Sequence, residues 1–439
     1  MSAAIVMGVA LLAASCGSDD GSSSDKATTV VAQTTAPAES TPASAVPEAS
    51  AADTTVPETT GGSDTTEAAA TDSSAAGSDL TLTEPVVLVA LVSDPGGTDQ
   101  NAVPDFNDGS RLAVEEINAA GGIGGLPIDF QVIETLPTGD TVINSLNLAL
   151  EKNPTAIIGP VSSTALLAIS AKVDEAGVPM IHNTTEPKAV HDGEAGSQWI
   201  FSNRPSNEGA AAIGVKYAVE ELGASKIGLM HTNTSFGVSG AASQTAAAAA
   251  AGVSISSDQS FEFNATDLTN AALAMDGSDV ILDWGTPSTV GLAVNTLAQQ
   301  GLQNIPHIGP GSVGFGFFAK IVGDASLLNG VLGVVDCNPV GDDRPEVKAF
   351  VTSFTEKYGY APSYAAAEQY DSVYILKHVI ETAGSDDPEA IRDGLESLTG
   401  VSGMCSDNYF NDNGLLNHTS VVAKFVDGSL ETQKSYDVE

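Results

Sequence analysis

The stretch 155–170 constrains the fold of this chain more than any other. It opens with a short apolar run, Ala156 to Ile158, which is too short for a helix and is typical of a buried parallel strand. Gly159 and Pro160 end the strand, and a hydroxyl-rich turn then begins a helix whose apolar residues recur at helical spacing. The stretch therefore predicts a strand that passes directly into a helix, as in parallel α/β proteins.

The start of this predicted helix is a candidate binding site. Ser162 and Ser163 lie beside backbone N–H groups that have no partner within the helix and that carry a partial positive charge. Such groups point out of the carboxyl edge of the sheet and can bind an anion. We therefore predict that Ser162 and Ser163 bind a carboxylate or another small polar group. The alternative is that one of them serves only as the N-cap of the helix.

Short apolar strands and amphipathic helices alternate along most of the chain. One set ends near residue 203 and a second begins near Arg204, which predicts parallel sheets with helices on both faces. A crossing strand, three helices and a last strand at 421–427 follow. The predicted fold class is α/β, with two doubly wound parallel-sheet lobes joined by a hinge that the chain crosses several times. Lobe 1 is predicted at 84–203 and 338–418, and lobe 2 at 204–337 and 419–439.

The N-terminal region has the composition of an export signal and a tether. Residues 1–15 are small and apolar, as in a signal peptide, and the run that ends at Cys16 resembles a bacterial lipobox, which predicts lipidation of Cys16. Residues 16–83 are mostly Ser, Thr, Ala, Gly, Pro and acidic residues, without an aromatic residue, and cannot form a core, which predicts a disordered tether. We therefore expect an extracytoplasmic protein that contacts the outer face of the cell membrane only through its lipid.

The charge and the cysteines narrow the possible partners. The formal net charge is −40, with 16 basic against 56 acidic residues, which disfavours nucleic acid and anionic lipid surfaces as partners. After Cys16, only Cys337 and Cys405 remain, and two thiols in an exported domain suggest one disulfide. No His or Cys spacing suits a structural zinc site, so we predict no metal and no cofactor.

The segment 111–123, with the sequence RLAVEEINAAGGI, resembles the signature of the branched-chain amino-acid-binding proteins. These are type I periplasmic solute-binding proteins of ABC importers. Further runs of the family occur in the expected order at 157–160, 176–181, 235–237, 357–362 and 367–373. The resemblance implies a venus-flytrap closure on a small solute, delivery of that solute to the permease subunits of an ABC transporter, and no enzymatic activity.

The resemblance also implies roles for individual residues. Ser163 matches the hydroxyl that holds the ligand carboxylate, and Thr184 and Thr185 fall where the family offers a carbonyl and a hydroxyl. Phe236 falls at the position of an aromatic wall, and Trp284, at the end of a lobe 2 strand, is expected to line the same cleft. The alternatives are a hydrophobic staple at a helix start for Phe236 and an ordinary core position for Trp284.

The sequence departs from the family at the expected partner of a ligand ammonium group. The family often places an acid after Gly-Pro, whereas here Gly309-Pro310 is followed by Gly311. Asp283 is the predicted substitute. We therefore expect a branched-chain or other amino acid as ligand, with a non-amine carboxylate or an amide as the alternative. A ligand sensor of the same fold is the alternative function, and an exported hydrolase is a third class that would need a nucleophile next to a base.

Overall fold

The computed structural model describes residues 80, 82–93, 102–135, 139–184, 197–405, 407–408, 410, 414, 416 and 419–437. All of them belong to one compact unit, Asp72–Glu439. The predicted signal peptide, nearly all of the tether and Cys16 lie outside the described residues.

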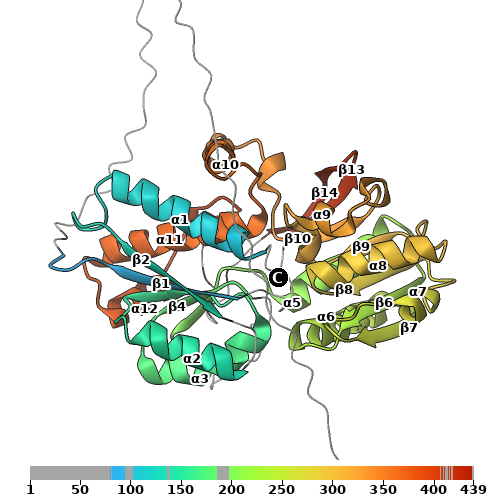
Figure 1. Cartoon of the computed structure of the whole chain (residues 1–439), viewed down its shortest axis with the longest axis horizontal. Helices are drawn as coiled ribbons and strands as arrows, with labels where there is room; N and C mark the ends of the chain where they lie inside the picture. Colours follow the sequence, from blue (N-terminus) through green and yellow to red (C-terminus); the bar gives the residue numbers. More distant parts are fainter. Residues whose placement is uncertain are drawn as a thin grey trace, which may run out of the picture. The chain divides into compact units, whose positions relative to one another are not determined.

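The first sheet is entirely parallel and has the strand order β2-β1-β3-β4-β5. Its strands are β1 (Val87–Ser93), β2 (Asp129–Thr135), β3 (Ala156–Ile158), β4 (Met180–His182) and β5 (Ile200–Ser202). Among the described residues, the helices α1 (Ala102–Ala119), α2 (Gly139–Leu150) and α3 (Ser163–Ala176) connect successive strands from β1 to β4. Figure 1 shows α1 on one side of this sheet and α2 with α3 on the other.

The unbroken apolar runs of β1 and β3 reflect burial on both faces of the sheet. Leu88 and Ile158 pack toward α1 and the later helix α11 (Tyr364–Ala383), whereas Val89 and Ile157 pack toward α2 and α3. Successive side chains of a strand point to opposite faces, so a strand covered by helices on both sides needs an apolar residue at every position.

The second sheet has seven strands in the order β14-β13-β10-β9-β8-β6-β7. The strands are β6 (Lys226–Thr232), β7 (Ser254–Phe261), β8 (Val280–Trp284), β9 (His307–Gly309), β10 (Leu332–Val335), β13 (Thr419–Val426) and β14 (Ser429–Asp437). The helices α5 (Asn207–Glu220) and α6 (Ser235–Ala251) pack on one face, and α7 (Thr269–Leu273) and α8 (Pro287–Gln299) pack on the other. Short helical segments follow β9 and β10: η2 (Gly311–Gly314), α9 (Phe318–Val322), η3 (Ala325–Leu327) and η4 (Pro339–Gly341).

The chain passes between the two sheets more than once. After β10 it returns to the first sheet through α10 (Pro345–Tyr358), α11 and α12 (Pro388–Glu396), and α11 packs beside α1 in the first core. A short antiparallel pair follows, β11 (Val401–Ser402) with β12 (Asp407–Asn408), before the chain re-enters the second sheet as β13. The predicted architecture of two α/β lobes with several crossings is therefore present.

The predicted end of the chain is wrong in one respect. The strand expected at 421–427 does not close the fold, because β14 follows it and pairs with it in antiparallel fashion. β14 is a polar edge strand with only one buried side chain, Tyr436, so it lacks the apolar run used to find strands. Its signal is the dipeptide Asp427-Gly428, whose φ angles of 49° and 86° suit a tight hairpin turn.

Candidate functional site

A cavity of about 200 Å³ lies between the two sheets. Many of its lining residues lie shortly after strands of both sheets: 161–164 follows β3, Arg204 follows β5, Thr234 and Phe236 follow β6, and 310–312 follows β9. Ligands of parallel α/β sheets bind beyond the carboxyl ends of the strands, so this cavity is where the topology places a binding site.

The wall contributed by the first sheet is polar. Ser162 is the N-cap of α3, and its hydroxyl accepts a hydrogen bond from the backbone N–H of Ala165 at 3.4 Å. Ser163 is 5% exposed and lines the cavity, and its hydroxyl makes no hydrogen bond within the described part of the chain. Ser162 therefore acts as the helix cap, which was the alternative to ligand binding. The hydroxyl of Ser163 is not used by the described part of the protein, so it is available to a ligand.

The wall contributed by the second sheet is aromatic. The rings of Phe236 and Trp284 lie 5.8 Å apart between centroids, and the Trp284 indole N–H donates to Asn207 Oδ1 at 2.8 Å. Gly240 of α6 makes room for the indole, because a Cβ at that position would lie 2.0 Å from the ring. Trp284 is 2% exposed, so it is a core residue that also lines the cavity.

Three helix N-termini converge on the cavity. Ser162, Thr234 and Thr286 are the N-cap residues of α3, α6 and α8, and all three line it. The first N–H groups of each helix and the aligned peptide dipoles give this end a partial positive charge. The arrangement favours an anionic group in the cavity.

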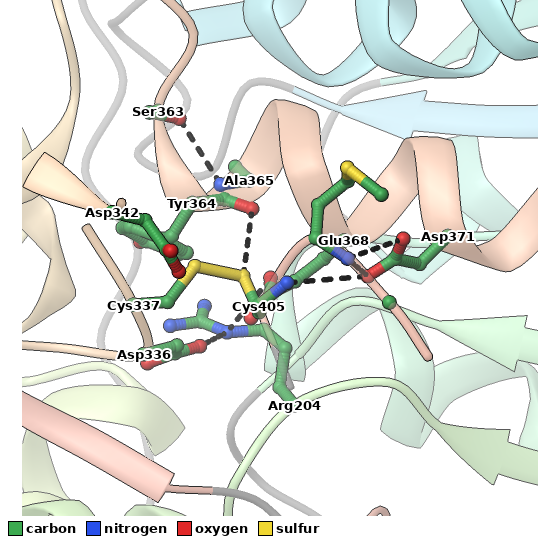
Figure 2. The surroundings of a disulfide bond; sticks show 12 residues. Arg204, Asp336, Cys337, Asp342, Ser363, Tyr364, Ala365, Glu368, Asp371 and Cys405 are labelled. Carbon is green, nitrogen blue, oxygen red and sulfur yellow. Dashed lines mark hydrogen bonds and ion pairs between the residues drawn. A yellow bond between two sulfur atoms is a disulfide. The ribbon is translucent and has the colours of Figure 1, made fainter. Parts of the chain in front are cut away.

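A buried charged network, which the sequence analysis did not predict, forms another part of the lining. Arg204 Nε donates to Asp336 Oδ2 at 2.5 Å and lies 3.8 Å from Glu368 Oε2, as Figure 2 shows. The guanidinium also lies over the ring of Tyr364, 4.8 Å from its centroid. Arg204, Asp336 and Tyr364 line the cavity, whereas Glu368 is not one of its lining residues.

Burial and charge shift the pKa values of this network in different ways. Burial raises the pKa of Glu368 well above its usual value, and the neighbouring Asp336 charge raises it further. Burial alone would lower the pKa of Arg204, but the carboxylates of Asp336 and Glu368 outweigh this effect and raise it. Burial also raises the pKa of Tyr364. The stable ionisation state is therefore an Arg204–Asp336 ion pair with a neutral Tyr364.

The structure joins Cys337 and Cys405 by a disulfide, with 5.3 Å between their Cα atoms. Cys337 directly follows Asp336 on a crossing segment, and the backbone N–H of Met404 donates to Asp371 of α11 at 2.8 Å (Figure 2). The bond therefore fastens the crossing segment that carries Asp336 to the segment after α12.

The structure brings together four of the predicted ligand-binding residues: Ser162, Ser163, Phe236 and Trp284 all line the cavity. Thr184 and Asp283 are buried but are not among its lining residues. Asp283 is fully buried and its Oδ2 lies 3.3 Å from His307 Nε2, so it faces a histidine instead of the cavity. Thr185 lies outside the described residues.

Several lining residues were missed by the sequence analysis. Arg204 follows β5 with one residue between them, and Asp336 directly follows β10, so the rule that sites lie beyond the carboxyl ends of strands could have found both. Phe106, Phe315 and Tyr364 come from helices and turns distant in sequence and reach the cavity only through tertiary packing.

The described residues lack two further features. None of the helices found there is long and apolar enough to cross a membrane. Within the same part of the chain, no group of three or more His, Cys, Asp or Glu side chains is placed to hold a metal ion.

The fold and the cleft define a two-lobed α/β solute-binding protein. A family profile described as periplasmic binding protein matches residues 86–429, so the chain belongs to that family. This confirms the family predicted from the segment 111–123 and the runs that follow it.

Known proteins of similar sequence and structure agree with this assignment. The Leu/Ile/Val-binding protein homolog 8 of Brucella melitensis is 24% identical over 319 residues, which cover 69% of this chain and 77% of that protein. A leucine-binding protein from Thermotoga maritima superimposes with a TM-score of 0.74 at 22% identity, covering 80% of this chain and 99% of that one. A solute-binding protein of an ABC transporter from Rhodopseudomonas palustris, solved with 3,4-dihydroxybenzoic acid, gives a TM-score of 0.71 at 17% identity, with coverages of 81% and 98%. These structures confirm the predicted type I periplasmic-binding-protein fold.

Proposed function

We propose that this chain is an extracytoplasmic, lipid-anchored solute-binding protein that closes its cleft on a small carboxylate-bearing solute and delivers it to an ABC permease. The observation that carries the ligand part of this proposal is Ser163. The residue is 5% exposed, its hydroxyl has no partner among the described residues, and it lies at a helix N-terminus that lines the cavity. A ligand carboxylate at this place would accept hydrogen bonds from the hydroxyl and from the first N–H groups of the helix.

Two ligand classes fit this role. A branched-chain or other amino acid is supported by the names of the Brucella and Thermotoga proteins. A carboxylate without an amine is supported by the aromatic acid in the Rhodopseudomonas structure and by Gly311, which offers no side-chain partner for an ammonium group. Either class would be bound without turnover, as expected of a transport receptor.

A thermal-shift screen tests the binding function. Amino acids, short-chain acids, aromatic acids and amides would each be added to the purified protein, because specific binding to the folded state raises the melting temperature. We expect a subset of the carboxylates to raise it in a saturable way. If no carboxylate does so while an uncharged solute does, the proposed carboxylate seat at Ser163 is wrong. Growth of cells that lack the protein on the identified solute would separate transport from sensing, since a sensor is not needed for uptake.

The lipid anchor has its own test. The variant Cys16→Ala, expressed with the complete N-terminal segment, should move from the membrane fraction to the soluble extracytoplasmic fraction. The neighbouring variant Ser15→Ala is the matched control and should stay with the membrane. Membrane retention of the Cys16→Ala variant would exclude Cys16 as the site of lipidation.

A further inference from the structure

We infer that the ligand is an aromatic carboxylate without an amine, and that Arg204 is the residue that excludes an ammonium group. This inference rests on the proposed solute-binding function and narrows the ligand of the same cavity. It depends on three observations: which nitrogen atoms of Arg204 are hydrogen-bonded within the protein, which acids line the cavity, and which aromatic rings surround it.

Arg204 uses only part of its guanidinium within the protein. Its Nε donates to Asp336 Oδ2 at 2.5 Å, whereas its two Nη atoms make no hydrogen bond within the described residues. The residue is 8% exposed and lines the cavity. A Cβ at Gly311 would lie 3.0 Å from Arg204 Nη2, which places this unpaired edge beside the cavity segment 310–312. A buried guanidinium edge attracts a hydrogen-bond acceptor and repels an ammonium group.

No acid of the described lining is available to an ammonium group. Asp336 is the one carboxylate among the lining residues, and it is already paired with Arg204. Asp283, the acid that the sequence offered instead, faces His307 and does not line the cavity. An amino acid would therefore bury its ammonium group without a free carboxylate among the described lining residues, which is unfavourable.

The body of the cavity is lined by aromatic rings. Phe106, Phe236, Phe263, Trp284, Phe315 and Tyr364 all contribute to it. The Tyr364 hydroxyl makes no hydrogen bond within the described residues, and a Cβ at Gly311 would lie 2.7 Å from its oxygen. Aromatic side chains pack well against a flat ring through offset-stacked or edge contacts. A ligand with a carboxylate at Ser163 and an aromatic ring among these side chains satisfies both features.

Two matched pairs of ligands test the inference by calorimetry on the complete protein. The first pair is 3-phenylpropanoate and phenylalanine, and the second is 4-methylpentanoate and leucine, so that each pair differs only in the amine. We expect 3-phenylpropanoate to bind at least tenfold more tightly than each of the other three. Tighter binding of leucine or phenylalanine than of its amine-free partner would overturn the inference and leave the proposed function intact. Tightest binding of 4-methylpentanoate would overturn the aromatic part, and no binding of any of the four would count against the inference and the proposed function together.

Substitution of Gly311 tests the role of Arg204. Gly311→Asp and Gly311→Asn add side chains of the same size next to Arg204 Nη2, and they differ in charge. In the Asn variant the preference for 3-phenylpropanoate over phenylalanine should be kept. In the Asp variant the new carboxylate would pair with Arg204 or with the ligand ammonium group itself, so that preference should fall at least tenfold. The same preference in both variants would show that the charge beside Arg204 Nη2 does not select against the amine. If neither variant folds, the ligand pairs on the natural protein still decide the inference.

Discussion

The two walls of the cavity are built on opposite principles. On the wall from the first sheet, Ser163 lines the cavity with a hydroxyl that has no partner within the described residues. On the wall from the second sheet, the polar groups are already used: Trp284 donates to Asn207 at 2.8 Å, and Ser312 donates to the carbonyl of Gly285 at 2.8 Å. The first wall therefore offers a side-chain hydroxyl to a polar group, whereas the side chains of the second wall mainly offer apolar surface beside the N-termini of α6 and α8.

For the proposed carboxylate ligand, the difference between the two walls implies one orientation in the cavity. A carboxylate placed at Ser163 and the start of α3 would direct the apolar part of the solute toward Phe236 and Trp284. The polar wall would fix the solute first, since it offers directional hydrogen bonds, and the aromatic wall would bury the rest on closure. The following changes, ordered by the size of the expected effect, probe each wall and its supports.

Removing the indole of the aromatic wall should have the largest effect. Trp284→Ala should lower the free energy of unfolding by about 3–5 kcal/mol, because it leaves a cavity in the second core. Urea denaturation would measure it. Trp284→Phe is the control, since it keeps a ring but loses the bond to Asn207, and it should cost less than the Ala variant. A loss below about 1 kcal/mol in Trp284→Ala would contradict the dual core and cavity role.

A buried acid behind the cavity should make stability depend on pH. Asp105 is 2% exposed in the first turn of α1, and burial raises its pKa from 3.8 to about 7. The folded state therefore holds this proton more tightly than the unfolded state. The stability that it contributes is complete below about pH 4 and is lost as the pH rises through about 7.

The variant Asp105→Asn should remove this dependence. At pH 8 it should be more stable than the natural protein by up to about 4 kcal/mol, and the two should converge near pH 4. Thermal melts from pH 4 to pH 8 would measure the difference. Asp276→Asn, which alters an exposed acid, is the control and should run parallel to the natural protein. A constant difference between Asp105→Asn and the natural protein over this range would refute a raised pKa.

Opening the disulfide should weaken the connection between the walls. The Cys337–Cys405 bond links residues 68 positions apart, and its loss in a Cys337→Ser, Cys405→Ser variant should cost roughly 2–4 kcal/mol of unfolding free energy. Urea midpoints of this variant should match those of the natural protein in reductant. Two free thiols in unreduced peptides of the natural protein, found by mass spectrometry, would argue against the bond.

The smallest change is expected at the polar wall. Ser163→Ala should weaken binding of the identified solute by about 1–3 kcal/mol, because a buried carboxylate would lose a hydrogen bond. The melting temperature without ligand should not fall, since the hydroxyl has no partner to lose among the described residues. Ser170→Ala on the same helix is the control, and calorimetry is the measurement. Equal affinity of Ser163→Ala and the natural protein would remove Ser163 from the site.

Much of the fold could be predicted because it depends on local patterns. Apolar runs such as 156–158 and helical periodicity such as that of 102–119 are set by burial on two faces or on one. Strand β14 was not predicted, because an edge strand needs few apolar residues. The dipeptide Asp427-Gly428, which is typical of a hairpin turn, could have indicated it. The cavity was foreseen only where a site residue also starts a helix or ends a strand, as Ser163 and Trp284 do.

By itself, the sequence determined the order of most strands and helices, the two-lobed α/β class and the polar helix start at Ser162 and Ser163. These follow from residue types over short distances along the chain. Only the tertiary structure decided that Asp283 turns to His307 and that Arg204 pairs with Asp336, 132 residues away. The charge that a cavity presents depends on which buried groups are already paired, and such pairs form between segments that only the folded chain brings together.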